Sequence, residues 1–188
     1  MDRFVVGISG ASGVILGIRT AEALVRKGSK VHLVVTDAAY RTIAEELGLF
    51  EVQFSHELQD KIEIHEIGDI AASIASGTYR HAGMVVVPCS MASLAAISLG
   101  LADTLLRRAA DVTLKERRRL VLVPREMPFS SLHLEHMTRL SNMGAVIMPP
   151  QPAWYYKPRS IEDIEEYIVG RILAALGVEN DLVEWKGS

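Results

Sequence analysis

A glycine-rich stretch near the start of the chain, "GISGASGVILGIRTAEAL" (residues 7–24), has residue types that suit ligand binding. Gly10 and Gly13 would let the backbone approach a ligand closely, and the free N–H groups of a following helix favour an anion such as phosphate. The glycine spacing does not match the dinucleotide pattern, and no lysine follows as in a Walker loop. The stretch therefore indicates either a site for a mononucleotide or another phosphorylated ligand, or a tight turn in which Ser9 and Ser12 cap the helix.

Hydroxyl and charged residues follow three later apolar runs, at the points where those runs end. Thr36 follows the second run, Ser90 and Ser93 follow the third, and Arg125 follows the fourth. Each hydroxyl could simply cap the next helix. Because the carboxyl ends of parallel strands line one crevice of an α/β sheet, however, these groups are expected to face a common ligand.

Three further charged residues could act on a second anion or on a proton. Arg108 and Lys115 are seven residues apart, which places both on one face of a helix, two turns from each other. Glu126 is the carboxylate that its strand-end position directs toward the cleft, where loss of water would suit it for proton transfer. The alternative is a structural ion pair between Glu126 and its neighbour Arg125.

Aromatic residues follow a proline-rich turn near the C-terminus and are expected in a loop. Trp154, Tyr155 and Tyr156 could form an apolar wall that stabilises a developing carbocation, with a phenol that hydrogen-bonds an anion. Alternatively they pack in a subunit interface. Arg171, in the last helical segment, would complete an anion site if it reached this cleft or that of a neighbour, and would otherwise be a surface arginine.

The cysteine and histidine pattern does not favour a metal site. Cys89 is the single cysteine, so no intramolecular disulfide can form, and it is interpreted as a buried thiol. His133, Glu135 and His136 lack the spacing of the metalloprotease helix. We therefore expect no metal in the site.

The remaining pattern predicts the elements that would position these residues. Short runs rich in valine and isoleucine are typical of strands buried on both faces, and they cover residues 3–8, 30–36, 83–88, 120–124 and 144–148. Helical spacing of apolar residues alternates with them over residues 14–27, 38–47, 92–114, 131–142 and 161–176. This alternation predicts an α/β fold: a three-layer, Rossmann-like flavoprotein-type sandwich with a mostly parallel sheet.

Composition limits the classes of protein that remain. The chain has 188 residues, 49% of them hydrophobic, and a net charge of −3. Its length suits one domain over residues 1–188, and its charge argues against a nucleic-acid partner. No apolar run is long enough to span a bilayer, so the high hydropathy is expected to serve subunit interfaces rather than a membrane. The N-terminus lacks a signal-peptide pattern, which predicts a cytoplasmic protein.

Several long motifs occur in an order that resembles the UbiX-type flavin prenyltransferases, a family also called the phenylacrylic or hydroxyarylic acid decarboxylases. They are "GISGASG", "PCSMASLA", "RAADVTLKERR", "LVLVPRE", "MGAVIMPP", "PAWYYKP" and "VGRILAALG", and the resemblance covers nearly the whole chain. It implies a homododecamer that binds FMN, with active sites where subunits meet. The reaction it implies moves a dimethylallyl group from dimethylallyl monophosphate to N5 and C6 of reduced FMN, and the prenylated FMN serves UbiD-type decarboxylases.

The resemblance also implies roles for individual residues. FMN would be bound by Gly10, Ala11, Ser12, Thr36, Ser90, Met91, Ala92, Ser93 and Arg125. The prenyl phosphate would lie among Arg108, Lys115, Glu126, Tyr155 and Arg171, with Glu46 nearby. Glu126 would manage proton transfer with help from Ser12 near N5, and the tail of residues 177–188 would pack on a neighbouring subunit.

Two departures from the family pattern and two alternative functions remain at this point. Thr36 and Asp37 replace a common Ser-Lys pair, and "KERRR" replaces the frequent "KERRP". We expect these changes to alter flavin contacts without abolishing function. The alternatives are an FMN-dependent decarboxylase of the related cysteine-decarboxylating group, whose histidine and asparagine-methionine motif are not found here, and a non-catalytic flavin-binding accessory protein.

Overall fold

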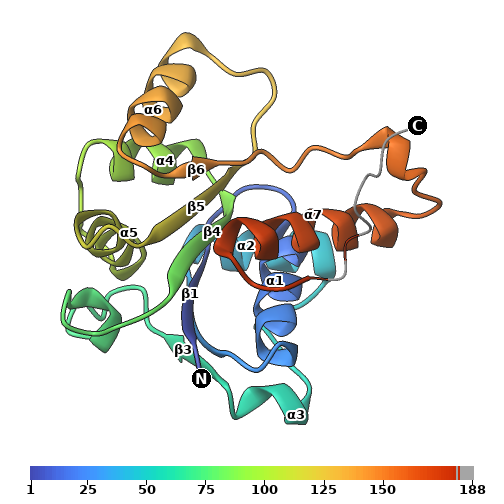
Figure 1. Ribbon diagram of the computed structural model, residues 1–188, viewed down its shortest axis with the longest axis horizontal. Coiled ribbons are helices and arrows are strands. Elements are labelled where there is room, and N and C mark those ends of the chain that lie inside the picture. The colour runs from blue at the N-terminus through green and yellow to red at the C-terminus, as the bar shows by residue number, and fades with distance from the viewer. Residues whose placement is uncertain (181, 183–188) are drawn as a thin grey trace.

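The computed structural model, which describes residues 1–180 and residue 182, contains a parallel sheet flanked by helices on both faces (Figure 1). The strand order is β3-β2-β1-β4-β5-β6, and every neighbouring pair is parallel. The strands are β1 (Arg3–Ile8), β2 (Lys30–Val35), β3 (Ile62–His65), β4 (Gly83–Cys89), β5 (Arg119–Pro124) and β6 (Val146–Ile147). The predicted Rossmann-like α/β class is thereby confirmed.

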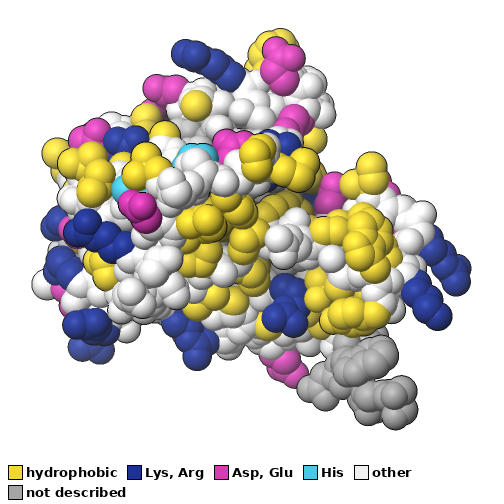
Figure 2. Space-filling model, turned by 90° about the horizontal axis from the view of Figure 1, so that it is seen from above, with side chains coloured by type: hydrophobic (Ala, Val, Ile, Leu, Met, Phe, Trp, Pro, Cys, Tyr) yellow, Lys and Arg dark blue, Asp and Glu magenta, His cyan; other side chains and the backbone are white. Residues whose placement is uncertain are grey.

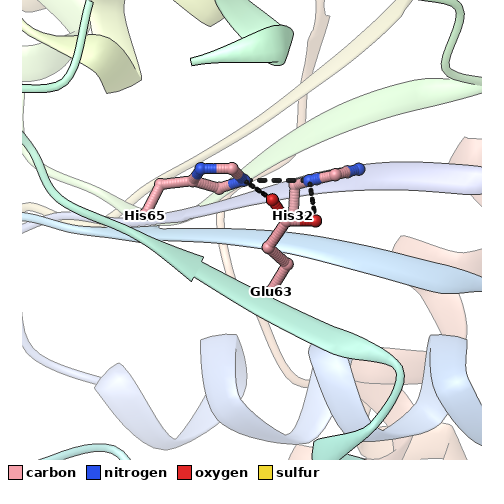
Figure 3. Close-up of side chains that lie close together, drawn as sticks. All are labelled: His32, Glu63 and His65. Carbon is pink, nitrogen blue, oxygen red and sulfur yellow. Dashed lines mark hydrogen bonds and ion pairs between the residues drawn. The ribbon is translucent and has the colours of Figure 1, made fainter.

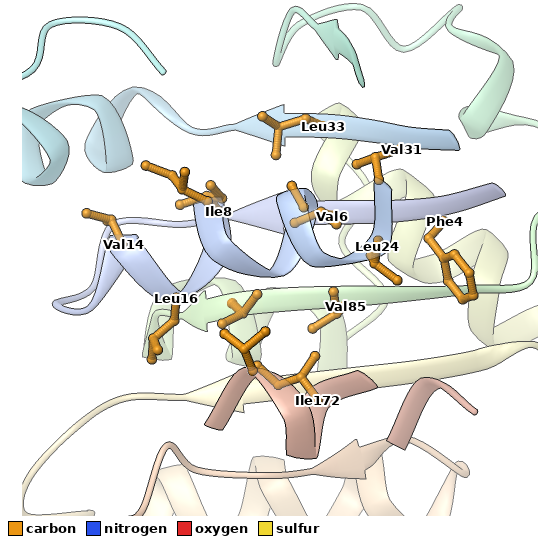
Figure 4. Close-up of a cluster of buried hydrophobic side chains, with 14 of the residues drawn as sticks. Phe4, Val6, Ile8, Val14, Leu16, Leu24, Val31, Leu33, Val85 and Ile172 are labelled. Atoms are coloured by element: carbon orange, nitrogen blue, oxygen red, sulfur yellow. The ribbon is translucent and has the colours of Figure 1, made fainter. Parts of the chain in front are cut away.

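The helices form two layers, each with its own hydrophobic cluster. They are α1 (Val14–Arg26), α2 (Asp37–Leu47), α3 (His56–Gln59), α4 (Met91–Ser98), α5 (Leu105–Lys115), α6 (Ser131–Asn142) and α7 (Ile161–Leu176), with short 3-10 turns η1 (Ser73–Ala75) and η2 (Trp154–Tyr156). Helices α1 and α7 pack side by side on one face (Figure 4), and α4, α5 and α6 cover the other. Because both faces are covered, β4 is buried along its whole length.

Helix α1 lies unusually close to the sheet at Gly17. A Cβ atom added to Gly17 would overlap the carbonyl oxygen of Val87 in β4 and lie 2.7 Å from Cγ1 of Ile8 in β1. Only a residue without a side chain fits there, because both neighbours are buried in the sheet. This close approach places the first turn of α1 against the carboxyl ends of β1 and β4.

Hydroxyl side chains begin most of the longer helices. In each case a serine or threonine oxygen accepts an N–H from the first turn, which satisfies a donor that has no partner within the helix. These caps are Thr36 for α2, Ser90 for α4, Thr104 for α5, Ser130 for α6 and Ser160 for α7. Helix α1 is the exception, since no side chain of its own N-cap, Gly13, bonds to it.

The structure departs from the predicted elements in three places. The helix predicted over residues 92–114 is two helices, because the chain turns at Gly100 (φ 73°) and α5 starts again after its Thr104 cap. The edge strand β3 and the short helix α3 were not predicted, and the last strand is shorter than residues 144–148. The strand over residues 3–8 and the helices over residues 131–142 and 161–176 are confirmed.

Two further expectations concern the periphery of the chain. None of the helices within the described residues is long and apolar enough to cross a membrane. The tail of residues 177–188, expected to pack on a neighbouring subunit, includes residues 181 and 183–188, which lie outside the described residues.

Candidate ligand cleft at the carboxyl edge of the sheet

Backbone hydrogen bonds join the ends of four neighbouring strands into one edge. The Thr36 N–H donates to the carbonyl of Ile8 at 3.0 Å, which ties the end of β2 to β1. The Ser9 N–H donates to Pro88 at 3.2 Å, and the Arg125 N–H donates to Cys89 at 3.2 Å, which ties β1 to β4 and β4 to β5. The structure therefore brings the predicted strand-end residues together along one edge.

Ser9 holds the first turn against the third, which differs from the capping role considered for it. Its buried hydroxyl donates to the carbonyl of Pro88 at 2.9 Å and accepts the N–H of Ser90 at 2.8 Å. Ser12 is exposed at the tip of the turn, and neither serine caps α1. The capping interpretation of Ser9 and Ser12 is therefore wrong.

Glu46 supplies the anion at the start of α1. Its two carboxylate oxygens accept the N–H of Gly13 at 3.1 and 3.0 Å, and one of them also accepts the N–H of Val14 at 3.2 Å. The positive end of a helix dipole favours a carboxylate at this position. Because Glu46 lies on α2, more than thirty residues away in sequence, no local pattern could identify it as the cap. Gly13 itself adopts a left-handed conformation with φ 94°.

The hydroxyls at the other strand ends cap helices and retain hydrogen-bonding capacity. Ser90 Oγ accepts the N–H of Ser93 at 3.2 Å and donates to the hydroxyl of Ser93 at 3.1 Å. Thr36 Oγ1 accepts the N–H of Ala39 at 3.1 Å. A hydroxyl has one donor and two acceptor positions, so a capping bond leaves room for a ligand. The first-turn N–H groups of Met91 and Ala92 add backbone donors at the same edge.

Arg125 and Glu126 line a cavity of about 280 Å³ directly after β5. Its other lining residues are Pro124, Met127, Pro128, Phe129, Pro149, Pro150 and Gln151. Within the described residues Glu126 forms no ion pair with Arg125, and one of its oxygens accepts the N–H of Met127 at 3.0 Å. The ion-pair alternative is therefore wrong. Glu126 is exposed in the single chain, so the loss of water expected around it is not present there.

Arg108 and Lys115 do not reach this edge within one chain. Arg108 donates to the carbonyl of Ala75 at 3.2 Å and pairs with Asp111 at 2.8 Å, and Lys115 pairs with Glu116. Helix α5 returns to the start of β5, so Lys115 at its C-terminus lies near the amino edge of the sheet. The predicted clamp for a second anion thus has both residues on one helix, but the helix points Lys115 away from the cleft.

Tyr155 and Arg171 lie beside the cleft and share a neighbour that the sequence analysis did not identify. The hydroxyl of Tyr155 is 3.3 Å from that of Tyr167, and this hydrogen bond is the main reason why the pKa of Tyr167 is raised. Tyr167 precedes Arg171 by one helical turn of α7, and both line a second cavity of about 270 Å³. Gln151 lines this cavity and the one beside Glu126, so the two are adjacent. The i, i+4 spacing was the signal that could have identified Tyr167.

The candidate metal ligands of the "HLEH" segment face different partners. His133 Nδ1 accepts the N–H of Ser130 at the start of α6, and His136 Nδ1 is 2.5 Å from the hydroxyl of Ser98. Cys89 is fully buried, and burial raises the pKa of its thiol to about 12. The interpretation of Cys89 as a buried thiol is confirmed.

Comparisons with known proteins agree with this architecture. A family model described as Flavoprotein matches residues 1–173. A flavin prenyltransferase UbiX of Chlamydia pneumoniae is 49% identical over 186 residues, which are 98% of this chain and 97% of the relative. The crystal structure of AnUbiX (PadA1) in complex with FMN and dimethylallyl pyrophosphate is similar with a TM-score of 0.91 and 44% identity, covering 100% of this chain and 98% of that chain.

A third comparison concerns assembly. The crystal structure of a dodecameric FMN-dependent UbiX-like decarboxylase from Escherichia coli O157:H7 is similar with a TM-score of 0.89 and 42% identity, covering 98% of this chain and all of that one. A parallel sheet with hydroxyl, N–H and arginine donors gathered beyond its strand ends defines a nucleotide-binding α/β protein. The chain belongs to the flavoprotein family and, within it, to the UbiX flavin prenyltransferases.

Proposed function

We propose that this chain transfers a dimethylallyl group from dimethylallyl monophosphate to N5 and C6 of reduced FMN, and so makes prenylated FMN. The observation that carries the proposal is the joined strand edge, where phosphate-type donors lie next to an arginine, a carboxylate and a tyrosine-arginine pair. The family relationship supports the same reaction. The flavin supplies the two acceptor atoms, and the chain supplies binding, charge neutralisation and proton transfer.

The residues at the strand edge suit an FMN molecule. Hydroxyls and backbone N–H groups are the donors that bind a phosphate, and Arg125 adds a permanent positive charge. In this proposal they are Gly10, Ala11, Ser12, Thr36, Ser90, Met91, Ala92, Ser93 and Arg125. The hydroxyl of Thr36 keeps the hydrogen-bonding capacity of the serine that is common at this position, which supports flavin binding despite the change at Asp37.

The leaving phosphate needs positive charge that one chain does not gather at this edge. When the carbon–oxygen bond of the ester breaks, its electron pair leaves with the phosphate, and preorganised donors stabilise that charge. Tyr155 and Arg171 lie beside the cleft, whereas Arg108 and Lys115 lie on α5. We therefore propose that a neighbouring chain presents its own Arg108 and Lys115 to the cleft, and that Glu46 lies near the bound ester.

The surface supports such an assembly, which we propose to be a homododecamer. Hydrophobic side chains gather in the middle of the face in Figure 2, with most Lys and Arg side chains near its outline. The large exposed hydrophobic residues include Leu99, Leu101, Met127, Leu132 and Trp154. Contiguous apolar surface of this kind marks interfaces. In the assembly, a neighbour would also remove water from Glu126.

Glu126 is the proposed proton-transfer residue. It lies beside Arg125 in the cavity after β5, and the family relationship places a carboxylate there next to the flavin and the phosphate. A carboxylate can accept the proton released when C6 is bonded and return it to the departing phosphate. Ser12, exposed at the tip of the first turn, is proposed to assist near N5.

The test is anaerobic incubation of the full-length protein with reduced FMN and dimethylallyl monophosphate, followed by mass analysis of the extracted flavin. We expect a flavin that has gained one dimethylallyl unit. A parallel reaction with the diphosphate determines which ester is used. FMN binding without any new flavin mass would contradict the proposal and indicate an accessory flavin-binding protein.

A variant separates catalysis from binding. Glu126→Gln keeps the shape of the side chain and removes its base, so we expect FMN to be retained while prenylated flavin forms at least roughly a hundredfold more slowly. Glu135→Gln, an exposed acid on α6, serves as the control and should react at the wild-type rate. Near-normal turnover of Glu126→Gln would assign the proton transfer to the substrate phosphate instead.

The product suggests a partner reaction. We propose that the prenylated flavin is passed to a UbiD-type decarboxylase, and that the reaction takes place in the cytoplasm, where a reducing environment maintains the reduced flavin. Adding the product mixture to an apo-decarboxylase and measuring carbon dioxide release tests this step.

A further inference from the structure

Three side chains with metal-binding atoms converge on one face of the sheet, away from the strand-end cleft (Figure 3). His32 lies on β2, and Glu63 and His65 lie on the neighbouring edge strand β3. His32 is in register with Glu63, and Val34 with His65. Successive side chains of a strand alternate between faces, so these three residues share the face that α4, α5 and α6 cover.

The distances between their donor atoms match a single small cation. His32 Nδ1 is 2.9 Å from His65 Nε2 and 3.5 Å from Glu63 Oε2, and His65 Nε2 is 3.7 Å from Glu63 Oε1. In a tetrahedral zinc site with bonds of 2.0–2.2 Å, ligand atoms lie about 3.3 Å apart. The three separations fall on both sides of that value, so a small movement of the two rings suffices for ligation.

A hydrogen bond outside the cluster orients the buried ring. His32 Nε2 is 2.7 Å from the hydroxyl of Tyr79, which leaves Nδ1 directed toward Glu63 and His65. Metal-bound histidines commonly use their second nitrogen in this way. The side chains of His32 and His65 are 1% and 8% exposed, whereas Glu63 is 46% exposed and gives an ion a path from solvent. Burial also lowers the pKa of His32 to about 4, which keeps the ring neutral.

Lys30 provides a competing positive charge. Its Nζ lies 2.7 Å from Glu63 Oε2, and this hydrogen bond is the main reason why the pKa of Glu63 is lowered. The Lys30 side chain is 38% exposed, so its ammonium group can move into solvent when a divalent ion takes its place. A site for a cation therefore predicts that removal of Lys30 strengthens binding, whereas a merely structural network predicts no metal binding with or without it.

We propose that His32, Glu63 and His65 bind one zinc-type divalent cation that joins the edge strand β3 to β2. Two imidazoles and one carboxylate are ligands that Zn²⁺ accepts, with water in the fourth position. This site is independent of the proposed prenyl transfer, because none of its residues belongs to the strand-end cleft. Within the described residues, this is the cluster of histidine, cysteine and acidic groups with metal-ligand spacing.

The test is a titration of chelator-treated full-length protein with Zn²⁺, followed by calorimetry, and with Co²⁺, followed by its visible absorption bands. We expect one ion per chain, a tetrahedral Co²⁺ spectrum and a raised melting temperature with Zn²⁺. We expect Glu63→Gln and His65→Ala to weaken Zn²⁺ binding at least about tenfold, and Tyr79→Phe to weaken it roughly tenfold through the orientation of His32.

Two further variants keep the proposal falsifiable. Lys30→Met is expected to bind Zn²⁺ more tightly than the wild type, and His56→Ala, which alters an exposed histidine in α3, should bind with unchanged affinity. Circular dichroism verifies that each variant is folded. Absence of stoichiometric binding to the wild type, weaker binding by Lys30→Met, or equal loss in His56→Ala and His65→Ala would each overturn the proposal.

Discussion

Replacing Gly17 with alanine should destabilise the protein, because α1 contacts the sheet at this residue. The new Cβ would overlap the carbonyl oxygen of Val87 and lie 2.7 and 2.8 Å from two side-chain atoms of Ile8. Val87 and Ile8 are fully buried, so neither can move aside without moving a strand. Overpacking of this kind costs at most about 3 kcal/mol, and alanine returns about 1 kcal/mol of helix propensity.

The net loss is therefore about 2 kcal/mol. For a chain of this size it corresponds to a fall in melting temperature of about 4–8 °C. Differential scanning calorimetry of the flavin-free protein measures it directly. Gly68→Ala is the matched control, since a Cβ there meets nothing within 4 Å and Gly68 does not have a left-handed φ. If Gly17→Ala melted no more than about 1 °C below this control, α1 would not be fixed against β1 and β4 as described.

Three other outcomes follow from the cleft and the core. Replacing Ser90 and Ser93 together with alanine should weaken FMN binding about tenfold, whereas Ser130→Ala, which removes the equivalent cap of α6, should lose stability without losing FMN affinity. Equal FMN affinity in the double variant and the wild type would remove these hydroxyls from the flavin site. The Cys89 thiol, with its pKa raised to about 12, should resist alkylation at pH 8 in the native protein and react at once in denaturant. Light scattering should give a mass many times the 20.6 kDa of one chain, and an active monomer would contradict a cleft shared between chains.

The sequence predicted the elements that are buried on both faces or strongly amphipathic. The run at residues 3–8 and the helix at residues 161–176 have patterns that allow one assignment, and both are confirmed. Strand β3 was missed because it is a short edge strand in which Ile62 and Ile64 alternate with Glu63 and His65 inside a polar segment. The turn at Gly100 was missed because apolar residues continue on both sides of it.

The strand-end residues were predictable because parallel strands end at one edge, which fixes where Thr36, Ser90 and Arg125 must meet. The cap of α1 was not, since Glu46 reaches Gly13 only through the packing of α2 on α1. Helical spacing correctly placed Arg108 and Lys115 on one helix. It carried no information about which edge of the sheet that helix end would face, and this depends on the direction of the chain.

The sheet ends on its two shortest strands, β3 with four residues and β6 with two. Each outer edge thus offers few unpaired N–H and C=O groups to another strand, and β3 carries Glu63 and His65 at its centre and end. Long, flat, apolar edges are the templates for fibrous aggregation, and short or charged ones prevent it. A chain with so much exposed apolar surface can therefore associate through its helices and loops, in contacts that close on themselves, without risking indefinite growth of the sheet.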